Sequence, residues 1–266
     1  MSTFCARISN IKMSRTAVYT ALILRSRSSG ESNSEATLLT AEEGIIKATV
    51  FGGAKSKLRA HSAPYNSGQV WIYRDKSKDY GKISDFDVCN WRPGLRDKYD
   101  RTMAAAAVAE TILSSHGGGG EWGVALKIAT NTLDALEDAN EEFCGRVLVH
   151  FLWKWACFLG IQPHIENCSA CGKNSDNIFW FNVHEGTALC AICDSNNDEQ
   201  FSVNRERSGL LKLNPGCRRW LALTNDMESS DTHRYSMDNK TFNEVKSLVT
   251  AVLSAAYGKR LASWEW

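Results

Sequence analysis

Hydrophobic and polar residues alternate in five short runs along the first third of the chain, and turn-forming residues separate these runs. A period of two is typical of half-buried β-strands. The predicted strands are residues 17–24, 36–40, 45–51, 69–74 and 82–89. Because a closed sheet has no exposed edges, five strands without a long helix favour a small barrel of the OB kind, with an SH3-like barrel as the alternative.

The spacing of the apolar residues becomes helical after Pro93-Gly94. Three predicted helices follow one another and a fourth lies near the end of the chain: residues 95–115, 121–139, 140–159 and 241–257. Asn140 is a suitable N-cap for the third helix, and Gly258 ends the last one. The third helix carries an apolar stripe at a spacing of three to four residues: Phe143, Val147, Phe151, Trp155 and Phe158. Neighbouring helices are the simpler cover for this stripe, and a groove for a partner's peptide is the alternative.

Four cysteines form two C-x-x-C pairs, Cys168 with Cys171 and Cys190 with Cys193, and 18 residues lie between the pairs. This spacing is typical of a zinc site. Zinc prefers four thiolates in a tetrahedron, which leaves no position for water, so the predicted ion is structural rather than catalytic. The intervening residues predict a hairpin with its turn at residues 184–186. Four-thiolate iron, a disulfide pair and a redox centre are the alternatives.

The charges are unevenly distributed, although the net charge of the whole chain is only +1. Residues 1–82 carry 13 Lys and Arg against 6 Asp and Glu, whereas residues 83–167 carry 7 against 12. A basic first third on a nearly neutral chain indicates one surface suited to a polyanion.

Basic and aromatic residues in this first third form a predicted nucleic-acid surface. Two arginines follow the first predicted strand, and three further cations recur at every second position, which puts them on one side of an extended segment. Three strand aromatics are candidates for stacking on unpaired bases. The candidate DNA-binding residues are Arg25, Arg27, Lys55, Lys57, Arg59, Phe51, Trp71 and Tyr73. The plainer interpretation is a solvated charged surface with aromatics in the core.

The sequence lacks the short motifs of common enzymes. It contains no P-loop, no H-E-x-x-H, no G-x-S-x-G and no G-x-G-x-x-G after a strand. We therefore expect no catalytic residues and no enzymatic activity. The five cysteines outside the two pairs are scattered, and their odd number argues against a disulfide framework. The apolar run at residues 17–24 is too short to span a bilayer, so we expect a cytoplasmic protein.

Four segments in chain order carry motifs that together resemble the RecO family of bacterial recombination mediators. They are residues 21–44, with Gly30-Glu31 and with Thr40 before Gly44; Gly52–Arg59; Phe158–Cys193, with the four cysteines; and Tyr257–Ser263. Two departures stand out. Gly52 occupies a position where a lysine is usual in the family, and Val149 and His150 occupy positions where many relatives carry arginine.

The resemblance implies an α+β fold with an OB-fold domain at 16–92, a helical domain at 93–164, a zinc module at 165–196 and a C-terminal helical part at 197–266. The start of the chain lacks periodicity, so residues 1–15 are expected to be a loosely ordered extension. It implies binding to single- and double-stranded DNA, annealing of complementary strands, and loading of RecA, together with RecR, onto DNA coated by single-stranded-DNA-binding protein. It also implies a structural Zn²⁺ and a location in the nucleoid.

A partner groove on the third helix is the last expectation from the resemblance. The acidic tail of the single-stranded-DNA-binding protein is expected to dock there, against Arg146, His150, Phe151 and Trp155. An OB-fold and zinc protein that binds RNA as a transcription or translation accessory factor is the alternative function.

Overall fold

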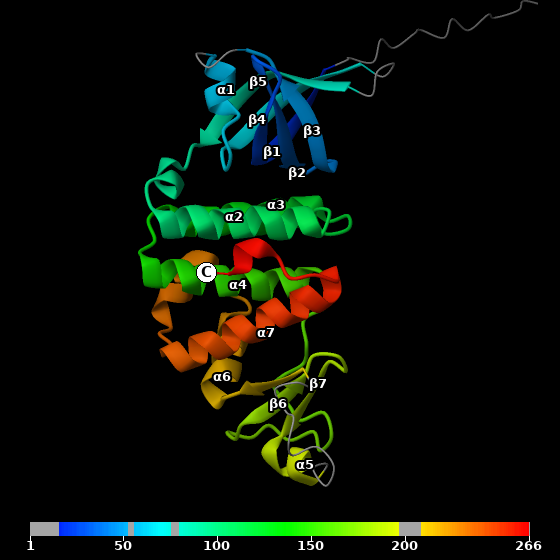
Figure 1. Cartoon of the computed structure of the whole chain (residues 1–266), viewed down its shortest axis with the longest axis vertical. Helices are drawn as coiled ribbons and strands as arrows, with labels where there is room; N and C mark the ends of the chain where they lie inside the picture. Colours follow the sequence, from blue (N-terminus) through cyan, green and yellow to red (C-terminus); the bar gives the residue numbers. More distant parts are fainter. Residues whose placement is uncertain (1–15, 53–55, 76–79, 197–208, 266) are drawn as a thin grey trace, which may run out of the picture.

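A closed barrel, a layer of helices and a small three-stranded sheet follow one another along the long axis of the molecule (Figure 1). The computed structural model describes residues 16–52, 56–75, 80–196 and 209–265. The predicted extension at residues 1–15 and the candidate Lys55 lie outside these ranges. No helix in the described ranges has both the length and the apolar character that a membrane crossing requires.

Five strands form the barrel: β1 (Thr16–Ser29), β2 (Asn33–Thr40), β3 (Gly44–Val50), β4 (Ser67–Asp75) and β5 (Tyr80–Asn90). Their order is β1-β2-β3-β5-β4, and β4 pairs with β1 to close the barrel. A short helix, α1 (Lys57–His61), lies between β3 and β4. The five predicted strands are confirmed, and the closed five-stranded barrel fits the OB kind.

The two sides of β1 and β2 serve two different cores. Ile23 and Leu38 point into the barrel and pack with Val70, Ile72 and Phe86. On the opposite side of the same strands, three leucines are buried in the core of the helical layer: Leu22, Leu24 and Leu39. Burial of one such side chain contributes about 1.5–3 kcal/mol. These three leucines therefore hold the barrel against the helices.

The helical layer is built around α4 (Glu141–Phe158). The other helical elements are α2 (Tyr99–Ser114), α3 (Trp122–Glu137), α6 (Pro215–Thr224), α7 (Asn239–Tyr257) and the 3-10 turns η1 (Pro93–Arg96), η3 (Ser229–Arg234) and η4 (Ala262–Trp264). Helices α2 and α3 lie between the barrel and α4, and α7 packs against the other side of α4 (Figure 1). The Asn140 side chain accepts a hydrogen bond from the Phe143 amide at 2.8 Å, so the predicted N-cap is confirmed.

Close backbone approach also joins the barrel to α3. Gly44, in the turn between β2 and β3, has a φ of +70°, and a Cβ atom there would lie 2.7 Å from the ring of Trp122. Only glycine meets both requirements without a shift of the neighbouring ring.

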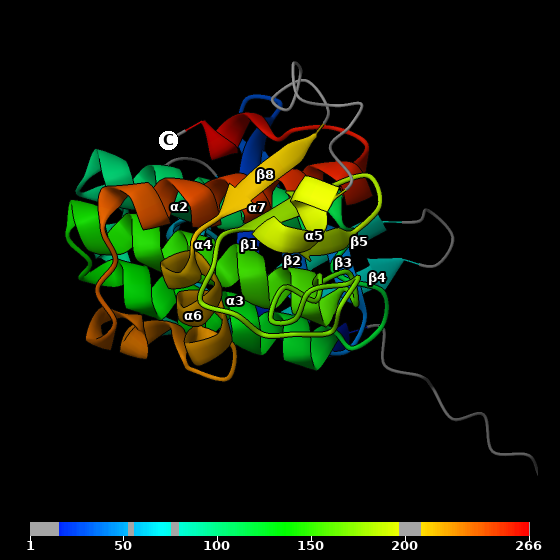
Figure 2. The same cartoon turned by 90° about the horizontal axis from the view of Figure 1, so that it is seen from below.

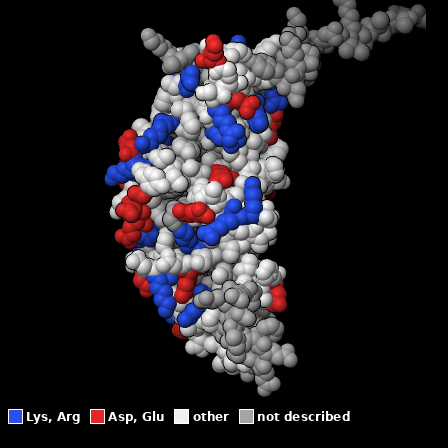
Figure 3. Space-filling view, viewed as in Figure 1, with Lys and Arg blue, Asp and Glu red and all other residues white. Residues whose placement is uncertain are grey.

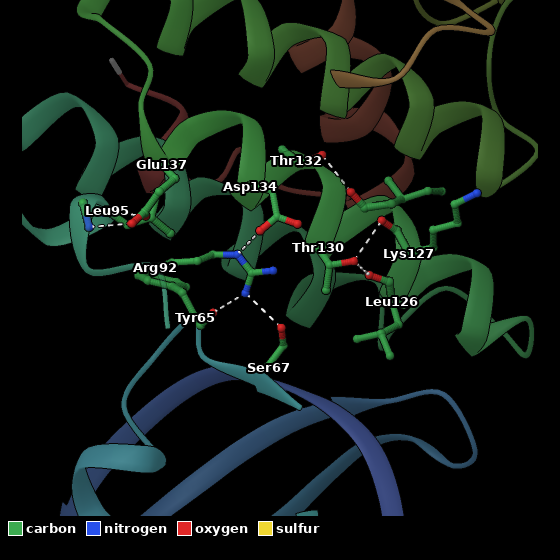
Figure 4. A network of polar contacts seen from close by, with 12 residues as sticks. Tyr65, Ser67, Arg92, Leu95, Leu126, Lys127, Thr130, Thr132, Asp134 and Glu137 are labelled. Carbon is green, nitrogen blue, oxygen red and sulfur yellow. Dashed lines mark hydrogen bonds and ion pairs between the residues drawn. The ribbon is translucent and has the colours of Figure 1, made fainter. Parts of the chain in front are cut away.

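Arg92 is the main polar connection between the barrel and the helices (Figure 4). Its side chain is buried. Its Nε donates to Asp134 Oδ1 of α3 at 2.7 Å, and its Nη1 donates to the backbone oxygen of Tyr65 at 2.7 Å and to Ser67 Oγ at 3.0 Å. Since Ser67 begins β4 and Tyr65 lies two residues before it, one guanidinium group fixes both parts of the molecule.

The third part is the sheet of β6 (Phe179–Asn182), β7 (Thr187–Cys190) and β8 (Leu210–Leu213), with the short helix α5 (Ala191–Asn196). Strands β6 and β7 form the predicted hairpin, and β8 joins the free edge of β6 to give the order β7-β6-β8. Figure 2 shows this sheet and α5 seen from below, in front of the helical layer.

Candidate nucleic-acid interface and metal centre

The four paired cysteines converge at one end of the small sheet. All four sulfur atoms lie within 4.8 Å of one another, and the Sγ atoms of Cys171 and Cys190 are 4.0 Å apart. This separation is about twice the S–S bond length of a disulfide. A tetrahedral ion with bonds of about 2.3 Å to sulfur needs sulfur atoms about 3.8 Å apart. The side chains of Cys168, Cys171, Cys190 and Cys193 therefore fit one four-thiolate metal ion.

Backbone amides stabilise the thiolate form of one of these sulfurs. Burial opposes ionisation of the Cys168 thiol, but hydrogen bonds from the amides of Cys190, Cys171 and Ala170 outweigh burial and lower its pKa to about 6. The Cys190 amide lies 3.4 Å from this sulfur. Because the thiolate is the metal-binding form, these bonds favour the state that holds a cation.

Arg218 of α6 connects the metal centre to the helical layer. Its guanidinium donates to the backbone oxygen atoms of Glu166, Ser175 and Asn177, in the segment that carries the first cysteine pair, and lies 3.7 Å from the ring centroid of Phe179. Burial lowers the pKa of this arginine. The loop around the metal centre is thus fastened to a helix that begins 22 residues after Cys193.

Four cations share the outward side of the barrel: Arg25, Arg27, Lys47 and Lys82, named here the basic face. Cross-strand pairing aligns them in two rows. Arg27 pairs with Glu35, Glu35 with Thr49 and Thr49 with Lys82, while Arg25 pairs with Thr37 and Thr37 with Lys47. Neighbouring strands lie about 4.8 Å apart, so the backbones of Arg25 and Lys47 are separated by about 10 Å and those of Arg27 and Lys82 by about 14 Å. One extended polyanion can span these separations.

The basic face keeps most of its charge. Glu35 is its acidic member, and Glu35 lies 3.7 Å from Lys47, with both side chains largely exposed. Such a pair is worth less than about 1 kcal/mol. The Nε atom of Arg25 is buried and has no hydrogen-bond partner among the described residues. The sequence pattern of Arg25 and Arg27 pointed to this face. Lys47 and Lys82 were missed, although alternation with the buried Ala48 and Ile83 places them outward.

Two of the predicted aromatic residues lie next to the basic face. Phe51 follows β3 and is 42% exposed, and the Lys82 ammonium lies 5.3 Å above its ring. Tyr73 pairs with Lys82 across β4 and β5. Trp71 points outward one step further along β4, beside Val18 and Asp85. All three aromatic side chains are therefore outside the barrel core.

The predicted geometry of the remaining cations is wrong. Lys57 and Arg59 belong to helix α1 rather than to an extended segment. In a helix, residues two positions apart project about 200° from each other, so the two side chains cannot share one side. Arg25 and Arg27, expected after the first strand, lie within β1, beyond a bulge that follows Ile23.

The predicted partner groove on α4 is also wrong. His150, Phe151 and Trp155 have no exposed surface, because α4 is covered by α2, α3, α7 and η3. Burial lowers the pKa of His150 to about 4, and its Nε2 lies 2.9 Å from the backbone oxygen of Thr224. Arg146, the fourth residue, lines a cavity. The apolar stripe is core packing against neighbouring helices, which was the simpler of the two interpretations.

Charge on the face shown in Figure 3 is mixed. Lys and Arg side chains alternate with Asp and Glu side chains over the helices, and no patch of one sign covers this face.

Two family profiles match the chain one after the other. The profile described as Recombination protein O N terminal matches residues 13–92, and the one described as Recombination protein O C terminal matches residues 96–265. The chain is 26% identical to the DNA repair protein RecO of Syntrophomonas wolfei over 73% of its own length and 76% of that relative. It is 27% identical to the Bacillus subtilis protein of the same name, over 72% and 74%. Identity to the Exiguobacterium protein of this name is 24% over 91% of both chains.

Proposed function

The chain belongs to the RecO family of DNA repair proteins, and from that premise we propose that it acts as a non-enzymatic recombination mediator. It anneals complementary DNA strands and helps to load RecA onto DNA coated by single-stranded-DNA-binding protein, together with RecR. It works in the cytoplasm, at the nucleoid. The basic face is the single observation that carries this proposal.

Phosphate neutralisation is the physical basis of the proposed activity. Arg25, Arg27, Lys47 and Lys82 displace counterions from a DNA strand, and Phe51 and Tyr73 offer rings for unpaired bases. Once the charge of one strand is neutralised, a second strand approaches with less repulsion, and base pairing supplies the energy of annealing. No covalent bond is made or broken. Trp71, Lys57 and Arg59 are proposed as contacts at the margin of this surface.

The metal centre has a structural role in this proposal. Zn²⁺ is the ion that suits four thiolates in a closed shell. Cys168, Cys171, Cys190 and Cys193 would hold it, and it would brace the sheet that is fastened to α6 through Arg218. A bound ion with no open position supplies stability rather than a reactive water.

Salt dependence of DNA binding tests the basic face. For single strands, the slope of log affinity against log salt is about −0.7 for each phosphate contacted. The variant with Arg25, Arg27, Lys47 and Lys82 changed to Gln should bind a labelled single strand more weakly, with a slope smaller by about 3. The matched control changes four exposed lysines elsewhere to Gln: Lys127, Lys173, Lys212 and Lys259. Equal slopes for the two variants would refute the assignment.

Strand annealing tests the function itself. The protein should speed the annealing of complementary strands both when they are bare and when they are coated by single-stranded-DNA-binding protein. Failure with coated strands would remove the mediator role and leave a DNA-binding protein. Tighter binding to RNA than to DNA of the same sequence would favour an RNA accessory factor instead.

A further inference from the structure

A cavity of about 360 Å³ lies where the N-terminal turns of α2, α4 and α7 meet. Its walls are mostly apolar and include Met103, Leu148, Met237 and Phe242. At the edge stands Tyr99, a large aromatic side chain that is 77% exposed. An open apolar cavity of this size with an aromatic residue at its edge is typical of a binding site.

The polar part of the cavity is strongly acidic. Four carboxylates line it, those of Asp100, Glu141, Glu142 and Glu265, against the single cation Arg146. The Arg146 guanidinium already pairs with Glu142 at 3.1 Å and lies 3.5 Å from the backbone oxygen of Tyr235. Its charge is therefore committed to groups of the protein itself.

Helix dipoles reduce this negative charge without cancelling it. Each helix N-terminus is equivalent to about half a positive charge, so three of them offset about half of the formal charge of the lining. Two pairs of residues that flank the lining add no net charge, because Asp97 accompanies Lys98 and Asp238 accompanies Lys240. Arg101, next to Asp100, donates to backbone oxygen atoms at the end of α3. An excess of negative charge therefore remains around an apolar floor.

We propose that this cavity is the docking site for a short segment of a partner protein in which Lys or Arg residues flank one aliphatic or aromatic side chain. The apolar side chain enters between Met103 and Phe242 and contacts Tyr99. The flanking cations reach the exposed carboxylates of Glu141 and Glu265. An acidic segment meets repulsion at the same edge, so the charge of the lining selects the sign of the partner.

Two labelled peptides of equal length test the proposal. Both contain a central Trp-Leu pair, and one carries four lysines where the other carries four aspartates. Fluorescence polarisation with the full chain should give about tenfold tighter binding for the basic peptide at low ionic strength, with the preference reduced by added salt. The assay contains no nucleic acid, so its failure leaves the proposed DNA function untouched.

Variants locate the binding on the cavity. The double variant Glu141→Lys/Glu265→Lys should reverse the preference. The milder Glu141→Gln/Glu265→Gln should reduce it, and this variant keeps the test valid if the first one unfolds. Tyr99→Ala should weaken binding of the basic peptide about tenfold. The control Glu121→Lys adds a cation at the start of α3, the opposite end of the paired helices α2 and α3, and should change neither affinity.

Several results would overturn the proposal. The first is tighter binding of the acidic peptide to the unaltered chain, and the second is binding of neither peptide. The third is a preference for the basic peptide that stays as large in both double variants as in the unaltered chain. Self-association that Tyr99→Ala abolishes, without any peptide binding, would instead identify the cavity as a contact between copies of the chain.

Discussion

Replacement of Arg92 by Met tests how the barrel is held on the helices. The Arg92 side chain is 2% exposed, and its guanidinium joins Asp134 to the start of β4 at Tyr65 and Ser67. Methionine keeps an unbranched apolar chain but removes the charge and every donor. Both residues carry a Cβ, so the φ of +44° at this position affects them alike.

The loss of stability expected for Arg92→Met comes from the acceptor groups that lose their hydrogen-bond donor. Exchange of a buried ion pair for apolar side chains is often neutral. Here, however, the half-buried backbone oxygen of Tyr65 and the buried Ser67 hydroxyl would lose their donor. A hydrogen bond to a charged group is worth about 1.5–3 kcal/mol. Asp134 is 49% exposed, so water replaces the arginine there at little cost. We expect Arg92→Met to lower the free energy of unfolding by about 3 kcal/mol.

Urea denaturation measures this change through the transition midpoint. Arg96→Met is the matched control, because Arg96 is an exposed arginine of the same junction and donates to the backbone oxygen of Pro64. It should cost less than about 1 kcal/mol. Equal losses in the two variants would mean that Arg92 does not hold the junction. Asp134→Asn should behave like the control.

Two further predictions concern the metal and pH. Chelation, or Cys168→Ser, should release one ion for each chain, measured by elemental analysis, and should lower the melting temperature, because binding energy at a structural site is folding energy; a preparation without bound metal would refute this. Burial holds the pKa of His150 at about 4 against an ordinary value of about 6.5, so its contribution to stability is complete above about pH 6.5 and is lost as pH falls toward 4. The loss should reach about 3 kcal/mol, and His150→Gln should remove this part of the pH dependence; an unchanged profile of unfolding free energy against pH would contradict the assignment.

The barrel strands and the long helices could be predicted because their signals are local. Alternation places Ile23 inside the barrel and Leu22 outside, and the Asn140 cap and the final Gly258 mark helix ends within one turn. Helix α1 has only five residues, too few to show a helical period of apolar positions. Lys57 and Arg59 were therefore predicted to lie in an extended segment. The cysteine pairs were informative because a site for one four-thiolate ion requires this spacing.

Surfaces were harder to predict than elements. The stripe on α4 correctly indicated burial, but a stripe does not say what covers it, and Trp155 proved to be core. The acidic cavity was missed because Asp100, Glu141 and Glu265 come from three distant segments and meet only in the folded chain. The basic face was half predicted, since Lys47 and Lys82 depend on strand pairing between β3 and β5.

The link between Arg218 and the cysteine loop also constrains the order of events during synthesis. A ribosome releases Cys193 some 25 residues before Arg218. At about 5–20 residues per second, the four thiols spend about one to five seconds in the cell before the arginine that fastens their loop exists. The barrel, by contrast, is complete in the chain long before then. During that interval the four thiols are open to oxidation and to capture of a wrong metal.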